Sequence, residues 1–124
     1  MLHPYVALVW GMGASLVFFV SAYYWRVRNN AIHRAFALTG VALNLLSSAY
    51  LIYAVRFAGV EMPANYPVFI VTAHRLFATA MALVMIAMLI TGIRRNRRVH
   101  IALHRIFLPG YTLTYFSGLV IFHA

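Results

Sequence analysis

Long apolar runs separated by short polar turns dominate the pattern of this chain. Crossing a hydrocarbon core of about 30 Å takes about 20 helical residues. Four windows reach that length: Tyr5–Trp25, Ile32–Phe57, Val68–Ile93 and Ile101–Phe122. The turns between them are polar or contain proline, which ends helices. The pattern predicts one all-α domain over residues 1–124, an integral membrane four-helix bundle with up-down-up-down topology.

The composition strengthens the membrane interpretation. Of the 124 residues, 65% are hydrophobic and only Glu61 is acidic, so the chain cannot cover a soluble surface with charge. Cysteine is absent, which excludes disulfides and thiolate ligands. Enzymes that depend on paired carboxylates, a cysteine nucleophile or a glycine-rich phosphate loop are excluded on the same grounds.

The basic residues predict an orientation. All ten are arginines, and they concentrate beside the first and third loops. The positive-inside rule places those loops in the cytoplasm and both termini outside. We expect the membrane to be a prokaryotic inner membrane. The arginines lie at membrane ends without interleaved aromatic side chains, so anionic lipid explains them better than nucleic acid does. The arginines beside the first loop are Arg26, Arg28 and Arg34. Those beside the third loop are Arg94, Arg95, Arg97, Arg98 and Arg105.

A His-Arg-x-Phe motif occurs three times, and each copy opens an apolar run. The copies begin at His33, His74 and His104. Ionisable groups in membrane spans usually mark a proton path, an ion path or a cofactor. The predicted topology puts His33, His100 and His104 toward the cytoplasm, and His3, His74 and His123 toward the outside.

Histidines on different helices at matched depth favour haem b, because a low-spin iron takes two axial nitrogens. The first expected pair is His33 with His104. Arg34 and Arg105 would then pair with the haem propionates. We expect His100 as a further candidate ligand on the same side.

A second haem is expected in the outer half of the membrane. His74 lies too deep to reach water easily, so its imidazole needs a hydrogen-bond partner or an iron atom. The candidate partners at similar depth are His123 and His3, and Arg75 is the neighbouring cation.

The helix faces beside these histidines carry small and flexible side chains. On the third window His74, Met81, Met85 and Met88 share one face. On the second window Gly40 favours close helix packing, and Asn44 favours a hydrogen bond between helices.

The sequence leaves several alternatives open. Histidines and arginines near helix ends can simply anchor a span at the membrane surface, and His100 in the basic loop can contact headgroups. Three neutral imidazoles, from His33, His100 and His104, can also bind copper or zinc.

The second window from His33-Arg34 to Tyr50, the third from His74, and the segment His100-x4-Arg105-x3-Pro109 followed by Gly118 resemble the CtaM/YozB-like small four-helix membrane proteins found with haem–copper oxidases. The resemblance covers residues 30–122. It implies a role in cytochrome oxidase assembly or maturation, with His33, His74 and His100 as the family's characteristic histidines. The chain departs from the family pattern at Ala54, at Tyr111 and in its additional His104.

These observations predict a haem b-binding membrane protein of a respiratory system that transfers electrons or serves an oxidase. Its expected partners are membrane lipid and respiratory-complex subunits or a redox partner, and a homo-oligomer remains open. Two alternatives belong to other classes. One is a cofactor-free assembly or accessory subunit, and the other is a membrane anchor with a quinone site for a peripheral dehydrogenase.

Overall fold

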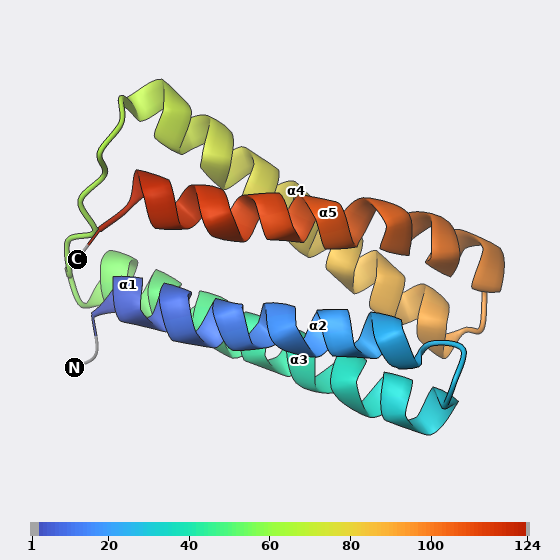
Figure 1. The fold of residues 1–124 in the computed structure, drawn as a ribbon. Helices are drawn as coiled ribbons and strands as arrows, with labels where there is room; N and C mark the ends of the chain where they lie inside the picture. The colour runs from blue at the N-terminus through green and yellow to red at the C-terminus, as the bar shows by residue number, and fades with distance from the viewer. Residues whose placement is uncertain (1–2, 124) are drawn as a thin grey trace. The chain divides into compact units, whose positions relative to one another are not determined.

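The computed structural model describes residues 3–123, and this part of the chain is helical (Figure 1). The elements are α1 (Pro4–Ala7), the π-helical η1 (Leu8–Met12), α2 (Gly13–Trp25), α3 (Asn30–Ile52), the π-helical η2 (Tyr53–Phe57), α4 (Val68–Ile93) and α5 (Arg97–Ile121). Because α1, η1 and α2 are continuous, as are α3 and η2, the described chain has four long helical segments. The prediction of an all-α chain with four long helices is confirmed.

Asparagine side chains explain why α3 and α5 begin earlier than the hydrophobic pattern predicts. Asn29 Oδ1 accepts hydrogen bonds from the backbone N–H groups of Ala31 and Ile32, at 3.0 and 3.2 Å. Asn96 Oδ1 accepts from the N–H of Val99 at 3.4 Å. Each amide oxygen satisfies donors that a helix start leaves without a partner, so the polar residues after it join the helix.

Three segments are long and apolar enough to cross a membrane: Pro4–Trp25, Asn30–Phe57 and Val68–Ile93. The fourth expected span is a helix of sufficient length, but α5 contains Pro109, several hydroxyl residues and the charged end at Arg97, which lower its mean hydropathy. Large apolar side chains lie on the outer surfaces of the spans. Trp10, Phe57 and Phe69 are 74%, 79% and 73% exposed.

The chain divides into two compact units, and the first contains the described residues 3–65 and 119–123. Within it, α2 and α3 lie side by side as antiparallel neighbours joined by a short turn (Figure 1). The Ser15 hydroxyl donates to the carbonyl of Gly40 at 2.7 Å, and the buried ring of Phe19 lies against the same glycine. The C-terminal end joins this unit through the backbone, where Asn65 N–H donates to the carbonyl of Ile121 at 2.7 Å.

The second unit, Tyr66–Gly118, is a hairpin of α4 and most of α5. Met81, Met85 and Met88 are buried, and Met81 packs against Gly110 of α5. The helix face on which the sequence groups these methionines is therefore the buried one.

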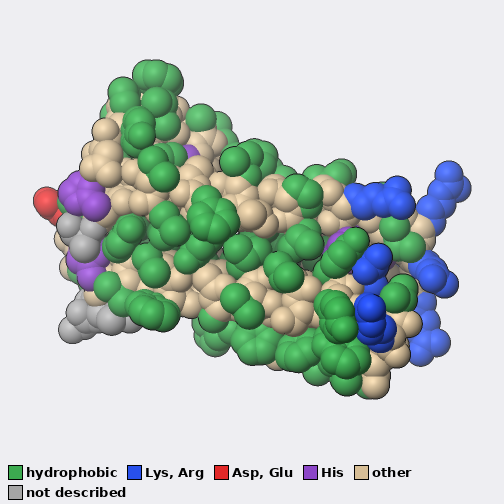
Figure 2. All heavy atoms as spheres, viewed as in Figure 1, with side chains coloured by type: hydrophobic (Ala, Val, Ile, Leu, Met, Phe, Trp, Pro, Cys, Tyr) green, Lys and Arg blue, Asp and Glu red, His purple; other side chains and the backbone are tan. Residues whose placement is uncertain are grey.

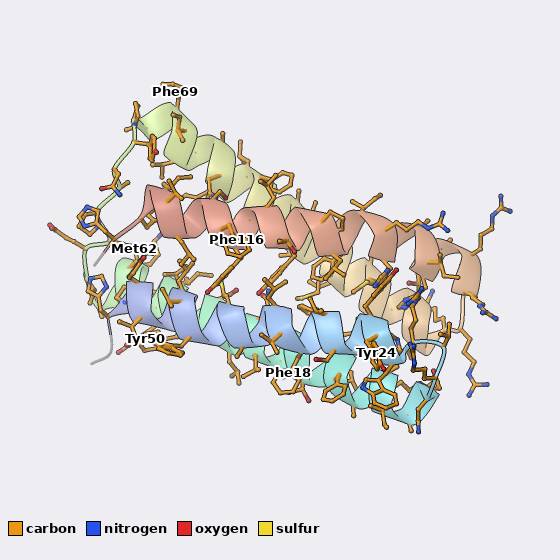
Figure 3. All side chains as sticks on the ribbon, viewed as in Figure 1. Phe18, Tyr24, Tyr50, Met62, Phe69 and Phe116 are labelled. Atoms are coloured by element: carbon orange, nitrogen blue, oxygen red, sulfur yellow. The ribbon has the colours of Figure 1, made fainter. Side chains whose placement is uncertain are left out.

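Charged and aromatic side chains gather at the helix ends. On the face drawn in Figure 2, hydrophobic side chains are spread along the helices, and the arginines that are visible lie toward helix ends. Tyr24, labelled in Figure 3, lies near the end of α2, with the Arg28 guanidinium 4.1 Å from its ring centroid. This pairing of an aromatic ring and a cation is typical of a membrane–water interface.

Candidate functional site

The three His-Arg-x-Phe motifs divide their side chains in the same way. His33, His74 and His104 are half-buried, whereas the arginine that follows each histidine is exposed. Successive helix positions differ by about 100°, so an inward histidine turns its neighbour outward. The arginines in question are Arg34, Arg75 and Arg105.

The phenylalanines of the motifs differ in their packing. Phe36 packs its ring 5.8 Å from that of Phe18, which Figure 3 labels on α2. Phe107 is only 1% exposed and packs 5.3 Å from the ring of Tyr111. Phe77 is 38% exposed. The motif therefore does not define a common environment for its aromatic residue.

His33 is anchored to the neighbouring helix through one ring nitrogen. Its Nδ1 lies 2.7 Å from the carbonyl oxygen of Ala22, in the last turn of α2. The backbone N–H of Arg26 donates instead to Tyr23, which leaves the Ala22 carbonyl to the imidazole. A carbonyl oxygen only accepts hydrogen bonds, so Nδ1 must carry the proton. In the neutral ring Nε2 then carries the lone pair.

His100 makes the equivalent contact in the second unit. Its Nδ1 lies 2.8 Å from the carbonyl oxygen of Met88 in α4, so it too must be the donor. The ring lies against Gly92, where an added Cβ would come within 3.1 Å of it. Thr91 also donates to the Met88 carbonyl, at 3.0 Å. The expectation that His100 lies in the basic loop is wrong, because the Asn96 cap lets α5 begin at Arg97.

The two anchored histidines share a sequence pattern that the analysis of the motifs missed. In Asn29-x-x-Ile32-His33 and Asn96-x-x-Val99-His100, the asparagine starts the helix and the histidine bonds a carbonyl of the preceding helix. The signal is in the sequence as Asn-x-x-Ile/Val-His after each arginine-rich turn. It is easily overlooked because the acceptors are backbone carbonyls, which leave no trace in side-chain patterns.

His74 is anchored to a side chain of α5. Its Nδ1 lies 2.9 Å from Ser117 Oγ, and Ser117 in turn donates its hydroxyl proton to the carbonyl of Thr114 at 3.0 Å. The hydroxyl has one proton, so Ser117 must accept from His74, and Nδ1 is again the donor. The depth of His74 predicted that its imidazole needs a partner, and in the structure Ser117 is such a partner.

His3 has the opposite arrangement. Its Nδ1 accepts a hydrogen bond from the backbone N–H of Tyr5 at 3.1 Å and so caps α1. The neutral ring therefore carries its proton on Nε2. His123 is exposed in the same unit, and its backbone N–H donates to Pro63 at 3.1 Å.

The predicted ligand pairs are distributed over the two units. His33 lies in the first and His104 in the second, and His74 is likewise in a different unit from His3 and His123. These pairs stay predictions. Within residues 3–123, no three histidine, aspartate or glutamate side chains form a metal-binding group, so the copper or zinc alternative gains no support.

The expectation of close helix packing holds at Gly40, whereas the described hydrogen bond of Asn44 is not the expected one between helices. Gly40 receives Phe19 and Ser15, as close packing of α2 and α3 requires. Asn44 accepts a hydrogen bond from Ser48 at 3.3 Å, within its own helix. A shallow hollow on α5 is lined by residues 108, 109, 112, 113 and 116 and contains none of the histidines.

Compared with known proteins, the chain matches no family model, no curated protein and no solved structure. The resemblance to oxidase-associated proteins stays an expectation.

Proposed function

We propose that the chain is a haem b-binding integral membrane protein of a respiratory system, with His33, His74 and His100 as candidate ligands through Nε2. One observation carries this proposal. All three imidazoles direct a protonated Nδ1 at an oxygen atom of the neighbouring helix. Histidines that bind metals usually donate their other N–H in this way, because the hydrogen bond fixes the tautomer and the ring orientation.

The donor set suits haem iron better than it suits a quinone. Iron is bound by a nitrogen lone pair, which these tautomers place on Nε2. A quinone carbonyl needs a donor, and in the neutral imidazoles the N–H is already committed to protein oxygens. When bound, haem b supplies one-electron transfer, and the chain's own histidines hold and orient it. The contact of His100 Nδ1 with the Met88 carbonyl places the lone pair of the neutral ring on Nε2. His100 is therefore an alternative to the predicted His104 as the ligand on α5.

The exposed arginines suit a second task at the same sites. Arg34, Arg75 and Arg105 lie beside half-buried histidines, on faces turned away from their own units. A guanidinium can pair with a carboxylate through two hydrogen bonds, which a haem propionate at the membrane surface would accept.

We propose a four-span topology in a prokaryotic inner membrane, with the Arg26–Asn29 and Arg94–Asn96 turns in the cytoplasm. Three helices of sufficient length and apolarity support insertion, and the arginine distribution supports the orientation. The resemblance to oxidase-associated proteins supports a redox partner or an oxidase as the partner.

The test is the visible absorption spectrum of the purified protein, oxidised and dithionite-reduced, with measured haem stoichiometry. We expect the low-spin spectrum of haem b in the wild type. It should be lost or converted in His33→Ala and His100→Ala, and a loss in His104→Ala without one in His100→Ala would favour the predicted pair of His33 with His104. His3→Ala is the matched control, because His3 caps a helix through Nδ1. Unchanged spectra in all variants of His33, His74 and His100 would contradict the ligand assignment.

One observation favours a second candidate function, a cofactor-free accessory subunit. The same hydrogen bonds tie α3 to α2 and α5 to α4, which is a structural role sufficient in itself. This candidate predicts a protein that carries no haem when purified from haem-replete cells. It also predicts that His33→Ala lowers thermal stability without any spectral change.

A further inference from the structure

Of the three anchored imidazoles, His74 has a side-chain hydroxyl, that of Ser117, as the partner nearest to its Nδ1, at 2.9 Å. His33 and His100 donate to backbone carbonyls, which substitution cannot remove. His74 donates to a hydroxyl, which can be removed by deleting one atom. A substitution can therefore remove the Ser117 acceptor of His74, whereas the carbonyl acceptors of His33 and His100 belong to the backbone.

The hydroxyl is itself oriented by its own helix. Ser117 donates to the carbonyl of Thr114 at 3.0 Å, and this contact directs a lone pair of Oγ at His74, 2.9 Å away. The chain His74 Nδ1–H, Ser117 O–H, Thr114 carbonyl runs in one direction, because the carbonyl at its end can only accept. Both His74 and Ser117 are half-buried, where hydrogen bonds are less exposed to competition from water.

We propose that Ser117 is a positioning residue for His74: it keeps the proton on Nδ1, presents Nε2 as the ligand atom, and tunes the reduction potential of the iron that Nε2 would bind. The second part rests on the proposed function. A hydrogen bond from Nδ1 increases the donor strength of Nε2. A stronger donor stabilises the ferric state and lowers the potential. Without the acceptor, the hydrogen bond that holds the proton on Nδ1 is lost.

The first experiment uses the full-length protein without cofactor, labelled with ¹⁵N-histidine, in detergent micelles above the titration range of the imidazoles. We expect the ¹⁵N signals of His74 to report an Nδ1–H tautomer in the wild type and a mixture of tautomers in Ser117→Ala. Ser117→Thr keeps the hydroxyl and should restore the wild-type signal. Thr112→Val is the matched control, because the Thr112 hydroxyl donates to Leu108 within α5.

The second experiment measures haem affinity and midpoint potential in the same variants. Ser117→Ala should weaken haem binding about 10- to 100-fold at the His74 site, as losses of supporting contacts do. It should also raise the midpoint potential, and Ser117→Thr should reverse both effects. If Ser117→Ala does not fold, Ser117→Cys gives the same direction with a weaker acceptor.

The outcomes separate the two proposals. A His74 tautomer that is unchanged by Ser117→Ala overturns the positioning role, whether or not haem binds. A tautomer that responds to Ser117 in a protein that binds no haem supports the hydrogen-bond role and overturns the proposed function. If haem binds with the same midpoint potential and affinity in the wild type, Ser117→Ala and Ser117→Cys, the tuning role is overturned.

Discussion

In the α2–α3 hairpin, a serine hydroxyl and a phenyl ring occupy the space against Gly40. In the α4–α5 hairpin, a methionine thioether lies against Gly110. In both hairpins the second helix starts with an asparagine cap and a histidine that is hydrogen-bonded to the preceding helix. The hairpins are therefore alike at the turn and differ in the side chains that fill the interior.

The different interiors indicate how strongly each hairpin constrains the separation of its two helices. A buried ring and a hydrogen bond to a carbonyl hold α2 and α3 at a defined separation. Methionine has three rotatable bonds and fills irregular space, so the α4–α5 interior can adapt. We expect the first hairpin to tolerate substitution less than the second.

The largest expected effect is at the two glycines. A Cβ added at Gly40 would lie 2.9 Å from Phe19 Cε1, and the ring is only 4% exposed. Gly40→Ala should lower the free energy of unfolding by about 1–3 kcal/mol, the usual cost of overpacking. Gly110→Ala is the matched variant, and it should cost less than about 1 kcal/mol because Met81 can change rotamer. Denaturation in mixed micelles, followed by circular dichroism, measures both. Equal losses would break the comparison.

The next effect is at the shared caps. Asn29 accepts two backbone N–H groups, whereas the described contact of Asn96 is a single bond of 3.4 Å. Asn29→Ala should cost about 1 kcal/mol, a typical value for a lost cap. Asn96→Ala should cost about half as much. The same micelle titration checks the order, and a larger loss for Asn96→Ala would contradict the geometry.

A smaller effect is expected at Ser15. Its hydroxyl is fully buried and donates to the Gly40 carbonyl at 2.7 Å. Hydrogen bonds between membrane helices average about 0.6 kcal/mol, so Ser15→Ala should lose about that much. Ser21→Ala, a half-buried serine on the same helix, is the control. A loss at Ser21 that matches the loss at Ser15 would argue against a specific contact.

The smallest effect concerns the turns. Arg95, between α4 and α5, has a φ of 57°, in the left-handed region. Arg95→Gly relieves that strain, but glycine also increases the conformational entropy of the unfolded chain. The free energy of unfolding should therefore rise by only about a few tenths of a kcal/mol. Arg28→Gly in the first turn gains no such relief and should be destabilising. A thermal melt of each variant in detergent shows the sign.

Hydrophobic pattern was sufficient to predict four helices, because period and length need only side-chain polarity. Helical spacing also placed Met81, Met85 and Met88 on one helix face, which the structure shows to be buried. The starts of α3 and α5 were placed too late, because an asparagine cap recruits polar residues into a helix.

The candidate site was predicted by residue type and missed in its contacts. His33, His74 and His100 were all named, but their acceptors are two backbone carbonyls and the hydroxyl of Ser117. Carbonyl groups are present at every residue, so only tertiary structure shows which one an imidazole meets. The same limitation hid the role of His3, whose position near the chain start gives no sign that Nδ1 caps a helix.

The central claim is that three histidines are held with Nε2 as the lone-pair atom, and that His3 is held the other way. The most direct test is the ¹⁵N spectrum of the imidazoles in the cofactor-free wild type, assigned with single histidine variants. The account predicts Nδ1–H signals for His33, His74 and His100 and an Nε2–H signal for His3. An Nε2–H tautomer at His33 or His100 would contradict it, because a carbonyl oxygen cannot donate to Nδ1.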